Sequence, residues 1–361
     1  MEMGKYKNMS FPWISKSKLK LDDYCKFEYY DRHVLKNIPP KKLDAVEGSN
    51  IHMVFAKFFG DLKREEVEPY FNLPQQDIQY HPFRKFIYER CMYYVHPEQR
   101  GNPVYKNLIR NFATAETERW VELNDILDNK DEIFKYFRPI LIEKRLEEET
   151  IFIYGTIDRA DIGIFPPKIK KIIITDYKSG NVPRDILDGP DPMKQFSWKL
   201  PSRLMKEMHF YVIEYLLKSG WKMHDELIEF LIDEKWWFTH KSNLSYQQSK
   251  KIKTQYLSSL NTKKNNRFKL YKGSKVLEKG DVIICVYFLG GKKPYKAMKE
   301  FNYRSYKAVL MHINDLRSRE FNQMYVTHPK FVFDEKVCSE YKRCSNVEKC
   351  RAMIENDKKN E

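Results

Sequence analysis

One stretch, Gly155–Gly180, constrains the fold of this chain more than any other, and it reads GTIDRADIGIFPPKIKKIIITDYKSG. Two runs dominated by β-branched and aromatic residues, Thr150–Ile157 and Lys171–Thr175, flank a break at Pro166 and Pro167. Runs of this composition, separated by a turn signal, are typical of paired strands. The stretch therefore predicts a β-hairpin.

Both predicted strands end in charged residues. Asp158 and Asp161 follow the first run, and Asp176 and Lys178 follow the second. Side chains two positions apart on a strand leave the same face, so Asp176 and Lys178 should point together, and the hairpin should bring Asp158 close to them. Carboxylates can hold a divalent cation while a lysine orients the attacking water, as metal-dependent phosphodiester hydrolysis requires. A lone D-x-K is more often a surface ion pair, and Asp161 can simply cap a turn.

The order G-x-I-D-R, apolar strand, D-Y-K-S-G is more specific than D-x-K alone. It resembles motifs II and III of the PD-(D/E)XK nuclease superfamily, in the RecB-like branch that includes the CRISPR-associated RecB-like exonucleases and the AddB-type helicase–nucleases. The resemblance implies an α/β fold with a restriction-endonuclease-like core, a mixed sheet flanked by helices. It also implies helical insertions and a C-terminal segment stapled by a cysteine-bound metal cluster.

A helix predicted over Leu43–Leu62 carries Gly48 and His52 with the spacing G-x-x-x-H. A histidine within such a helix is usually a packed core residue, although neutral imidazole is also a suitable ligand for a site that is mostly oxygen. The resemblance implies that this is motif I and that His52 contacts the metal.

The resemblance also assigns a catalytic set. It implies that His52, Asp158 and Asp176 hold one or two Mg²⁺ or Mn²⁺ ions, with the main-chain carbonyl of Tyr177 completing the shell. Lys178 would orient or deprotonate the water that attacks the phosphorus.

Two glutamates and a tyrosine extend this set. Glu143 lies on the strand predicted before the hairpin, where it can be an active-site residue or a charged strand edge. A helix predicted over Ser202–Lys218 has an apolar stripe, and the resemblance places the family pattern Q-x-x-x-Y on it, at Glu207 and Tyr211. Glutamate in place of glutamine departs from that pattern and adds a negative charge near the metal, so Tyr211 is the firmer site residue.

The three cysteines near the C-terminus require an explanation other than packing. Cys338, Cys344 and Cys350 are spaced C-x5-C-x5-C in a segment too polar for a core, and with a distant fourth thiolate they fit a [4Fe–4S] cluster or a zinc site. Cys25 lies on a helix predicted near the N-terminus, where by itself it is a small core residue. The resemblance implies that Cys25 is the fourth ligand. The iron–sulfur RecB-like nucleases have this arrangement, but their usual tail is nearer C-x2-C-x5-C. The departure leaves the cluster type open. Cys91 and Cys285 are expected to be core residues.

The charge balance favours a polyanionic partner. The 361-residue chain has a formal net charge of +15, which suggests nucleic acid first and an anionic membrane second. No signal peptide or membrane-spanning run is found, so we expect a cytoplasmic protein without structural disulfides. A basic, aromatic-rich excursion over about 248–280 can contact single-stranded DNA, or it can be a solvated, flexible loop.

These features divide the chain into four parts: 1–64 with the first cluster cysteine and motif I, a helical insertion over 65–139, a nuclease core over 140–335, and a cysteine segment over 336–361. Within the core, Asp225–His240 and Asp281–Gly291 are predicted as further strands.

The expected function is that of a metal-dependent deoxyribonuclease, an exonuclease acting on single-stranded DNA or DNA ends. Repair, recombination and CRISPR-type DNA processing are all compatible with it, with a helicase or CRISPR adaptation partner and an oligomer as options. A non-catalytic DNA-binding subunit with a vestigial site and a structural cluster is the alternative, and a zinc-stapled binding protein is a third reading.

Overall fold

The structure is a computed structural model. It describes residues 13–39, 43–73, 77–182, 202–232, 265–321 and 347–360, together with residues 255, 261–262, 323, 327 and 329.

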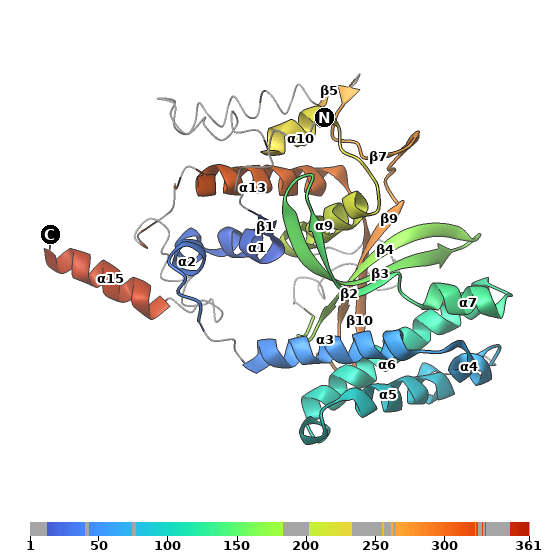
Figure 1. Ribbon diagram of the computed structural model, residues 1–361. Coiled ribbons are helices and arrows are strands. Elements are labelled where there is room, and N and C mark those ends of the chain that lie inside the picture. The colour runs from blue at the N-terminus through green and yellow to red at the C-terminus, as the bar shows by residue number, and fades with distance from the viewer. Residues whose placement is uncertain are drawn as a thin grey trace.

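One six-stranded mixed sheet forms the centre of the described chain (Figure 1). Its spatial order is β1, β3, β4, β9, β10, and β2 also pairs with β3. The β2–β3, β3–β4 and β9–β10 pairs are antiparallel, whereas β1–β3 and β4–β9 are parallel. The strands are β1 (Ile14–Ser15), β2 (Leu141–Glu148), β3 (Ile153–Phe165), β4 (Ile169–Lys178), β9 (Val282–Phe288) and β10 (Tyr295–Glu300). The predicted mixed sheet flanked by helices is confirmed.

Helices cover both faces of the sheet (Figure 1). The helices on one side are α1 (Lys16–Tyr24), α9 (Ser202–Lys218), α10 (Asp225–Ile232) and α13 (Tyr303–Phe321). Those on the other side are α3 (Leu43–Asp61), α5 (Pro82–Tyr94), α6 (Pro103–Ile126) and α7 (Lys130–Phe137). Smaller elements are α2 (Lys26–Tyr29), a π-helix (Tyr30–Val34), α4 (Arg64–Val67), 3-10 turns at Glu68–Tyr70, Ile78–Tyr80 and Pro97–Gln99, the hairpins β5–β6 (Asn261–Thr262, Asn265–Asn266) and β7–β8 (Tyr271–Lys272, Lys275–Val276), and α15 (Val347–Asn360).

The alternation of side chains along the central strands creates two separate cores. On β9, Val282, Ile284 and Val286 pack with the buried faces of α9 and α13. Their neighbours Ile283 and Cys285 pack with α3, α5 and α6 on the opposite side. Both cores are apolar, so a strand buried on both faces reads as an unbroken apolar run.

Several sequence-based expectations hold at the level of single elements. The hairpin, the helix over Ser202–Lys218 and the strand after Asp281 are all present. Cys91 and Cys285 are buried, as expected for core cysteines. In the part of the chain that the structure describes, no helix combines the length and apolarity that crossing a bilayer demands.

Other expectations are wrong. Asp225–Ile232 is helix α10 rather than a strand, because its buried residues follow a helical spacing, and residues 233–240 lie outside the described part. The first strand of the hairpin continues to Phe165, so Asp161 is a buried strand residue and not a turn cap. Cys25 lies at an extended break between α1 and α2 rather than within a helix.

The basic excursion is folded where it is described. Residues 248–254, 256–260 and 263–264 lie outside the described part, but Phe268 and Leu270 are fully buried, and the ammonium of Lys307 lies 4.7 Å from the centre of the Phe268 ring. Phe268 is therefore a core residue that cannot stack on a base.

A buried glutamate on α9 explains one glycine of the hairpin. Glu214 is fully buried, and a Cβ at residue 155 would lie only 2.9 Å from Glu214 Oε2. Glycine therefore allows α9 to approach β3 closely at this point. Burial raises the pKa of Glu214 to about 8.

This pKa predicts a pH-dependent stability. Because folding raises the pKa of Glu214 from 4.5, its contribution is complete below about pH 4.5 and is lost as the pH rises through about 8. Across that window, each pH unit can cost up to about 1.4 kcal/mol of unfolding free energy. We expect Glu214→Gln to gain stability relative to the wild type between about pH 5 and about pH 9 in urea denaturation. The exposed Glu98→Gln variant is the control, and a pH-independent difference for Glu214→Gln would contradict the assignment.

Candidate active site

Three potential metal ligands from three different elements meet beside β3. His52 of α3 lies with its Nδ1 2.9 Å from Oε1 of Glu143 on β2 and 3.5 Å from Oδ2 of Asp158 on β3. One ligand atom from each residue falls within 4.8 Å of the others. Imidazole nitrogen and carboxylate oxygens are ligands that Mn²⁺ and Mg²⁺ accept, so this donor set fits a hard divalent cation.

A local backbone distortion accompanies Glu143. On either side of it, Ile142 pairs with Arg159 and Lys144 pairs with Ile157. Glu143 itself has a φ of +43°, in the left-handed region that residues with a side chain seldom occupy. Such conformations cost free energy and concentrate at functional sites. The distortion accompanies the contact between Glu143 and His52. The regular alternation of side chains along a strand does not predict this contact.

The D-x-K pair lies at the end of β4. Asp176 and Lys178 share one face of the strand, and Lys178 Nζ lies 2.6 Å from Asp176 Oδ2. Between them, the main-chain N–H of Tyr177 donates a 2.8 Å hydrogen bond to Asp158 Oδ2. That bond joins β3 and β4 through a side chain, so the two aspartates are held at adjacent positions of the sheet.

The electrostatics of the group favour a bound cation. Burial and the neighbouring charge of Asp176 raise the pKa of Asp158 to about 7. Burial opposes the charged form of His52, but the hydrogen bond with Glu143 and the charge of Asp158 outweigh it and raise the His52 pKa to about 9. Crowded carboxylates of this kind resist ionisation unless positive charge is supplied.

At the end of β4, in contrast to the crowded carboxylates, a lysine and an aspartate stabilise each other's charged forms. Burial works against the charge of Asp176, yet the ammonium of Lys178 holds the pKa of Asp176 below its usual value. Burial likewise opposes the charge of Lys178, but Asp176 and Glu207 raise its pKa. Lys178 is therefore a cation in the folded protein and is about one quarter exposed.

Helix α9 supplies Tyr211 and Glu207 to the same region. Tyr211 is buried, and Lys16 Nζ lies 4.4 Å from the centre of its ring. Burial, with the charges of Asp176 and Asp158, raises the pKa of Tyr211 well above its usual value. Glu207 Oε2 lies 3.8 Å from Lys178 Nζ. The structure thus brings both predicted α9 positions beside the D-x-K pair.

Sequence reasoning missed two lysines of α1. Lys16 faces Tyr211, and Lys20 Nζ lies 2.9 Å from Glu207 Oε1. Their i, i+4 spacing after the N-cap of Ser15 puts both on one face of the helix. This spacing was the available signal, but nothing in the sequence indicates which distant element that face meets.

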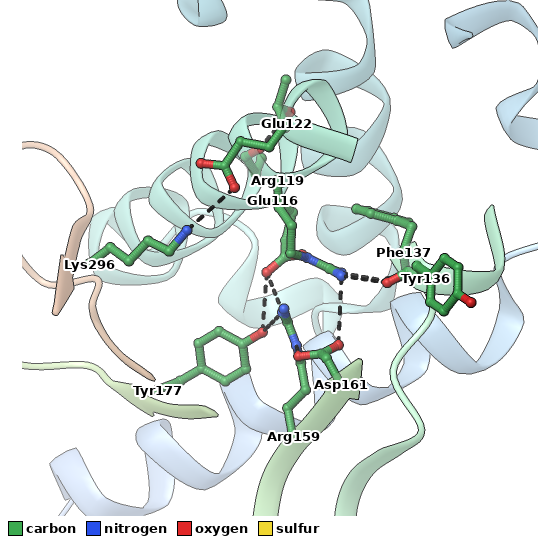
Figure 2. Close-up of polar contacts among 11 residues, drawn as sticks. Glu116, Arg119, Glu122, Tyr136, Phe137, Arg159, Asp161, Tyr177 and Lys296 are labelled. Atoms are coloured by element: carbon green, nitrogen blue, oxygen red, sulfur yellow. Dashed lines mark hydrogen bonds and ion pairs between the residues drawn. The ribbon is translucent and has the colours of Figure 1, made fainter. Parts of the chain in front are cut away.

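A buried ionic network lies behind the hairpin, and Figure 2 shows how its members converge between α6 and β3. The guanidinium of Arg159 contacts Glu116, the hydroxyl of Tyr177 and Asp161, the last at 2.6 Å. Arg119 donates to Glu116 at 2.8 Å and to the carbonyl oxygen of Phe137 at 2.6 Å. Buried charges that are paired in this way avoid the cost of isolated desolvation. The network therefore fixes the ring of Tyr177 from the far side of the sheet.

A cavity of about 290 Å³ lies on this same α6 side, lined by residues that include Arg119, Asp161, Thr175 and Tyr287. Asp176 and Lys178 point to the opposite face of the sheet, and none of the three grouped metal donors lines the cavity. The cavity is therefore separate from the candidate active site.

The predicted cluster cysteines are only partly described. Cys338 and Cys344 lie outside the described residues. Cys350 is buried on α15, and Cys25 is partly buried between α1 and α2. Next to Cys350, Lys349 forms an ion pair with Asp31, and its ammonium lies 5.8 Å from the centre of the Phe27 ring. The C-terminal helix thus lies against the segment that follows Cys25.

The mixed sheet carries clustered carboxylates and a lysine on its central strands β3 and β4, with a histidine beside them, and this arrangement fits a metal-dependent nuclease of the restriction-endonuclease-like class. A family model described as PD-(D/E)XK nuclease superfamily matches residues 14–198, just over half of the chain. The chain therefore belongs to the PD-(D/E)XK nuclease superfamily. This membership implies nuclease activity with a divalent metal and DNA as substrate. No curated protein matches the chain.

The three grouped donors predict a measurable metal affinity. We expect Glu143→Gln to weaken Mn²⁺ binding about tenfold or more, because it removes one charged oxygen ligand and replaces the charged hydrogen-bond partner of His52 with a neutral amide. Isothermal titration calorimetry with Mn²⁺ measures this change. The matched control is Glu147→Gln on the same strand, whose side chain is more than half exposed. Equal Mn²⁺ affinity in both variants would exclude Glu143 from the site.

Proposed function

We propose that the protein is a RecB-like, metal-dependent deoxyribonuclease that acts as an exonuclease on single-stranded DNA or DNA ends. The observation that carries the proposal is the meeting of His52, Glu143 and Asp158 next to the Asp176–Lys178 pair. The RecB-like motif order and the net charge of +15 support a polyanionic DNA substrate. DNA repair, recombination or CRISPR-type DNA processing is the proposed context.

Each residue has a proposed role. His52, Glu143 and Asp158 would hold the cation, with Asp176 and the main-chain carbonyl of Tyr177 as further ligands. The bound Mg²⁺ or Mn²⁺ would polarise the phosphate and lower the pKa of a water molecule. Lys178, paired with Asp176, would orient the attacking water. Tyr211 would support the pair from α9.

The charge state of Lys178 bears on this role. Because Asp176 and Glu207 keep Lys178 protonated, the residue is suited to orienting water and steadying negative charge rather than to accepting a proton. Orientation by a fixed ammonium needs a short, defined contact, and the 2.6 Å ion pair with Asp176 provides one.

We also propose that Cys25, Cys338, Cys344 and Cys350 bind a [4Fe–4S] cluster, with zinc as the alternative occupant. Support comes from the contacts of Lys349 with Asp31 and Phe27, which hold the helix of Cys350 against the segment that follows Cys25. A cluster there would join the N-terminal and C-terminal segments around the nuclease core.

The nuclease proposal predicts that Asp176→Asn loses at least about 100-fold in cleavage rate, because Lys178 loses its charged partner and the cation a ligand. Digestion of end-labelled single-stranded and circular DNA with Mn²⁺ measures this. Circles should survive if the enzyme requires an end. Asp128→Asn, at a fully exposed position, is the control and should cleave like the wild type. A metal-loaded wild type that binds DNA without cleaving it would instead favour the non-catalytic subunit.

The cluster proposal predicts that anaerobically purified protein contains about four iron and four sulfide ions per chain and has the visible absorption of a cluster. Cys350→Ser should lose both, whereas Cys91→Ser, at a buried helix position, should retain them. Zinc in place of iron would select the alternative occupant. Absence of both metals from the wild type would contradict a four-cysteine site.

A further inference from the structure

An ion pair between α1 and α9 lies next to Lys178, and the roles proposed above make no use of it. Lys20 Nζ lies 2.9 Å from Oε1 of Glu207, and Lys178 Nζ lies 3.8 Å from Oε2 of the same carboxylate. The Glu207 side chain is only 8% exposed. One buried carboxylate therefore lies between two ammonium groups that come from different elements.

In this geometry, two carboxylates compete as ion-pair partners of Lys178. Its ammonium lies 2.6 Å from Asp176 Oδ2 and 3.8 Å from Glu207 Oε2. Coulomb attraction increases as distance and local dielectric decrease, so a Glu207 without another cation would draw Lys178 away from Asp176. A shift of about 1 Å at a catalytic group can reduce a rate by about 100-fold.

Lys20 counters this attraction. Its contact with Glu207 is the shorter of the two, so it neutralises most of the carboxylate charge that Lys178 would otherwise sense. Burial lowers the pKa of Lys20, although Glu207 opposes that shift. The ammonium of Lys178 is thus left to its contact with Asp176.

We propose that Lys20 is a positioning residue of the active site, which neutralises Glu207 and thereby keeps Lys178 on Asp176. The inference rests on the proposed nuclease function, and it makes the N-terminal helix α1 a part of the active centre.

A second ion pair between the same two helices separates this role from simple helix packing. Lys206 Nζ on α9 lies 3.0 Å from Oδ2 of Asp23 on α1, and both side chains are more than one quarter exposed. Lys206 makes no described contact with Lys178. Loss of this pair also removes an ion pair between α1 and α9, but it does not release Glu207.

The test compares Mn²⁺-dependent DNA cleavage by Lys20→Met, Lys20→Arg, Lys206→Met, Glu207→Gln and the double variant Lys20→Met/Glu207→Gln. We expect Lys20→Met to lower kcat about tenfold or more with KM for DNA changed less than about threefold. Lys20→Arg and Lys206→Met should stay within about threefold of the wild type. The double variant should return to the rate of Glu207→Gln alone, because no buried charge remains for Lys20 to neutralise.

Three results would overturn the inference. They are full kcat in Lys20→Met, a double variant as slow as Lys20→Met, and an equal loss in Lys206→Met, which would indicate packing alone. Thermal melting checks that each variant folds, and Lys20→Gln replaces Lys20→Met if the latter does not. A wild type that fails to cleave DNA with Mn²⁺ contradicts the proposed function itself. The three results above contradict only the proposed role of Lys20 and leave the nuclease function standing.

Discussion

The hydrogen bond from the Tyr177 main-chain N–H to Asp158 Oδ2 connects the two strands on which the site is built. The backbone pairing of β3 with β4 extends to Arg159 and Thr175. Just beyond that pair, this side-chain hydrogen bond continues the connection between the two strands. It holds one carboxylate against β4 while Asp176 and Lys178 project from the same strand. Behind it, Arg159 contacts the Tyr177 hydroxyl within the network shown in Figure 2, so the strand end is fixed from both faces of the sheet.

The hairpin and its charged ends could be predicted because they depend on local rules. The alternation of a strand places Asp176 and Lys178 on one face whatever surrounds them, and the structure has that arrangement. The G-x-x-x-H spacing predicts His52 as a site residue, and in the folded chain His52 lies next to Asp158. Family membership, likewise, rests on residues 14–198, which contain the hairpin, the D-x-K pair and His52.

What could not be predicted depends on tertiary contacts. Glu143 turns to His52 through a left-handed backbone that no alternation pattern encodes. Short apolar runs fit a strand or a buried helix equally well, which is why Asp225–Ile232 was misread. Asp161 is tolerated in the core only because Arg159 and Arg119, one of them on a distant helix, reach it. The contact of Lys20 with Glu207 joins helices that are far apart in the sequence, and only their packing reveals it.

The two-residue strand β1 has a consequence for how the enzyme folds during its synthesis. Ile14 and Ser15 pair with Ile153 and Tyr154, so the first described segment of the chain waits for a partner that is synthesised much later. Closing so large a loop is entropically costly, and contacts of this kind tend to form late in folding. Helix α1 follows directly from β1, and its lysines reach the active centre only after that closure. A growing chain would therefore complete the site only after the hairpin, which carries Asp158 and Asp176, has been synthesised and β1 has paired with it.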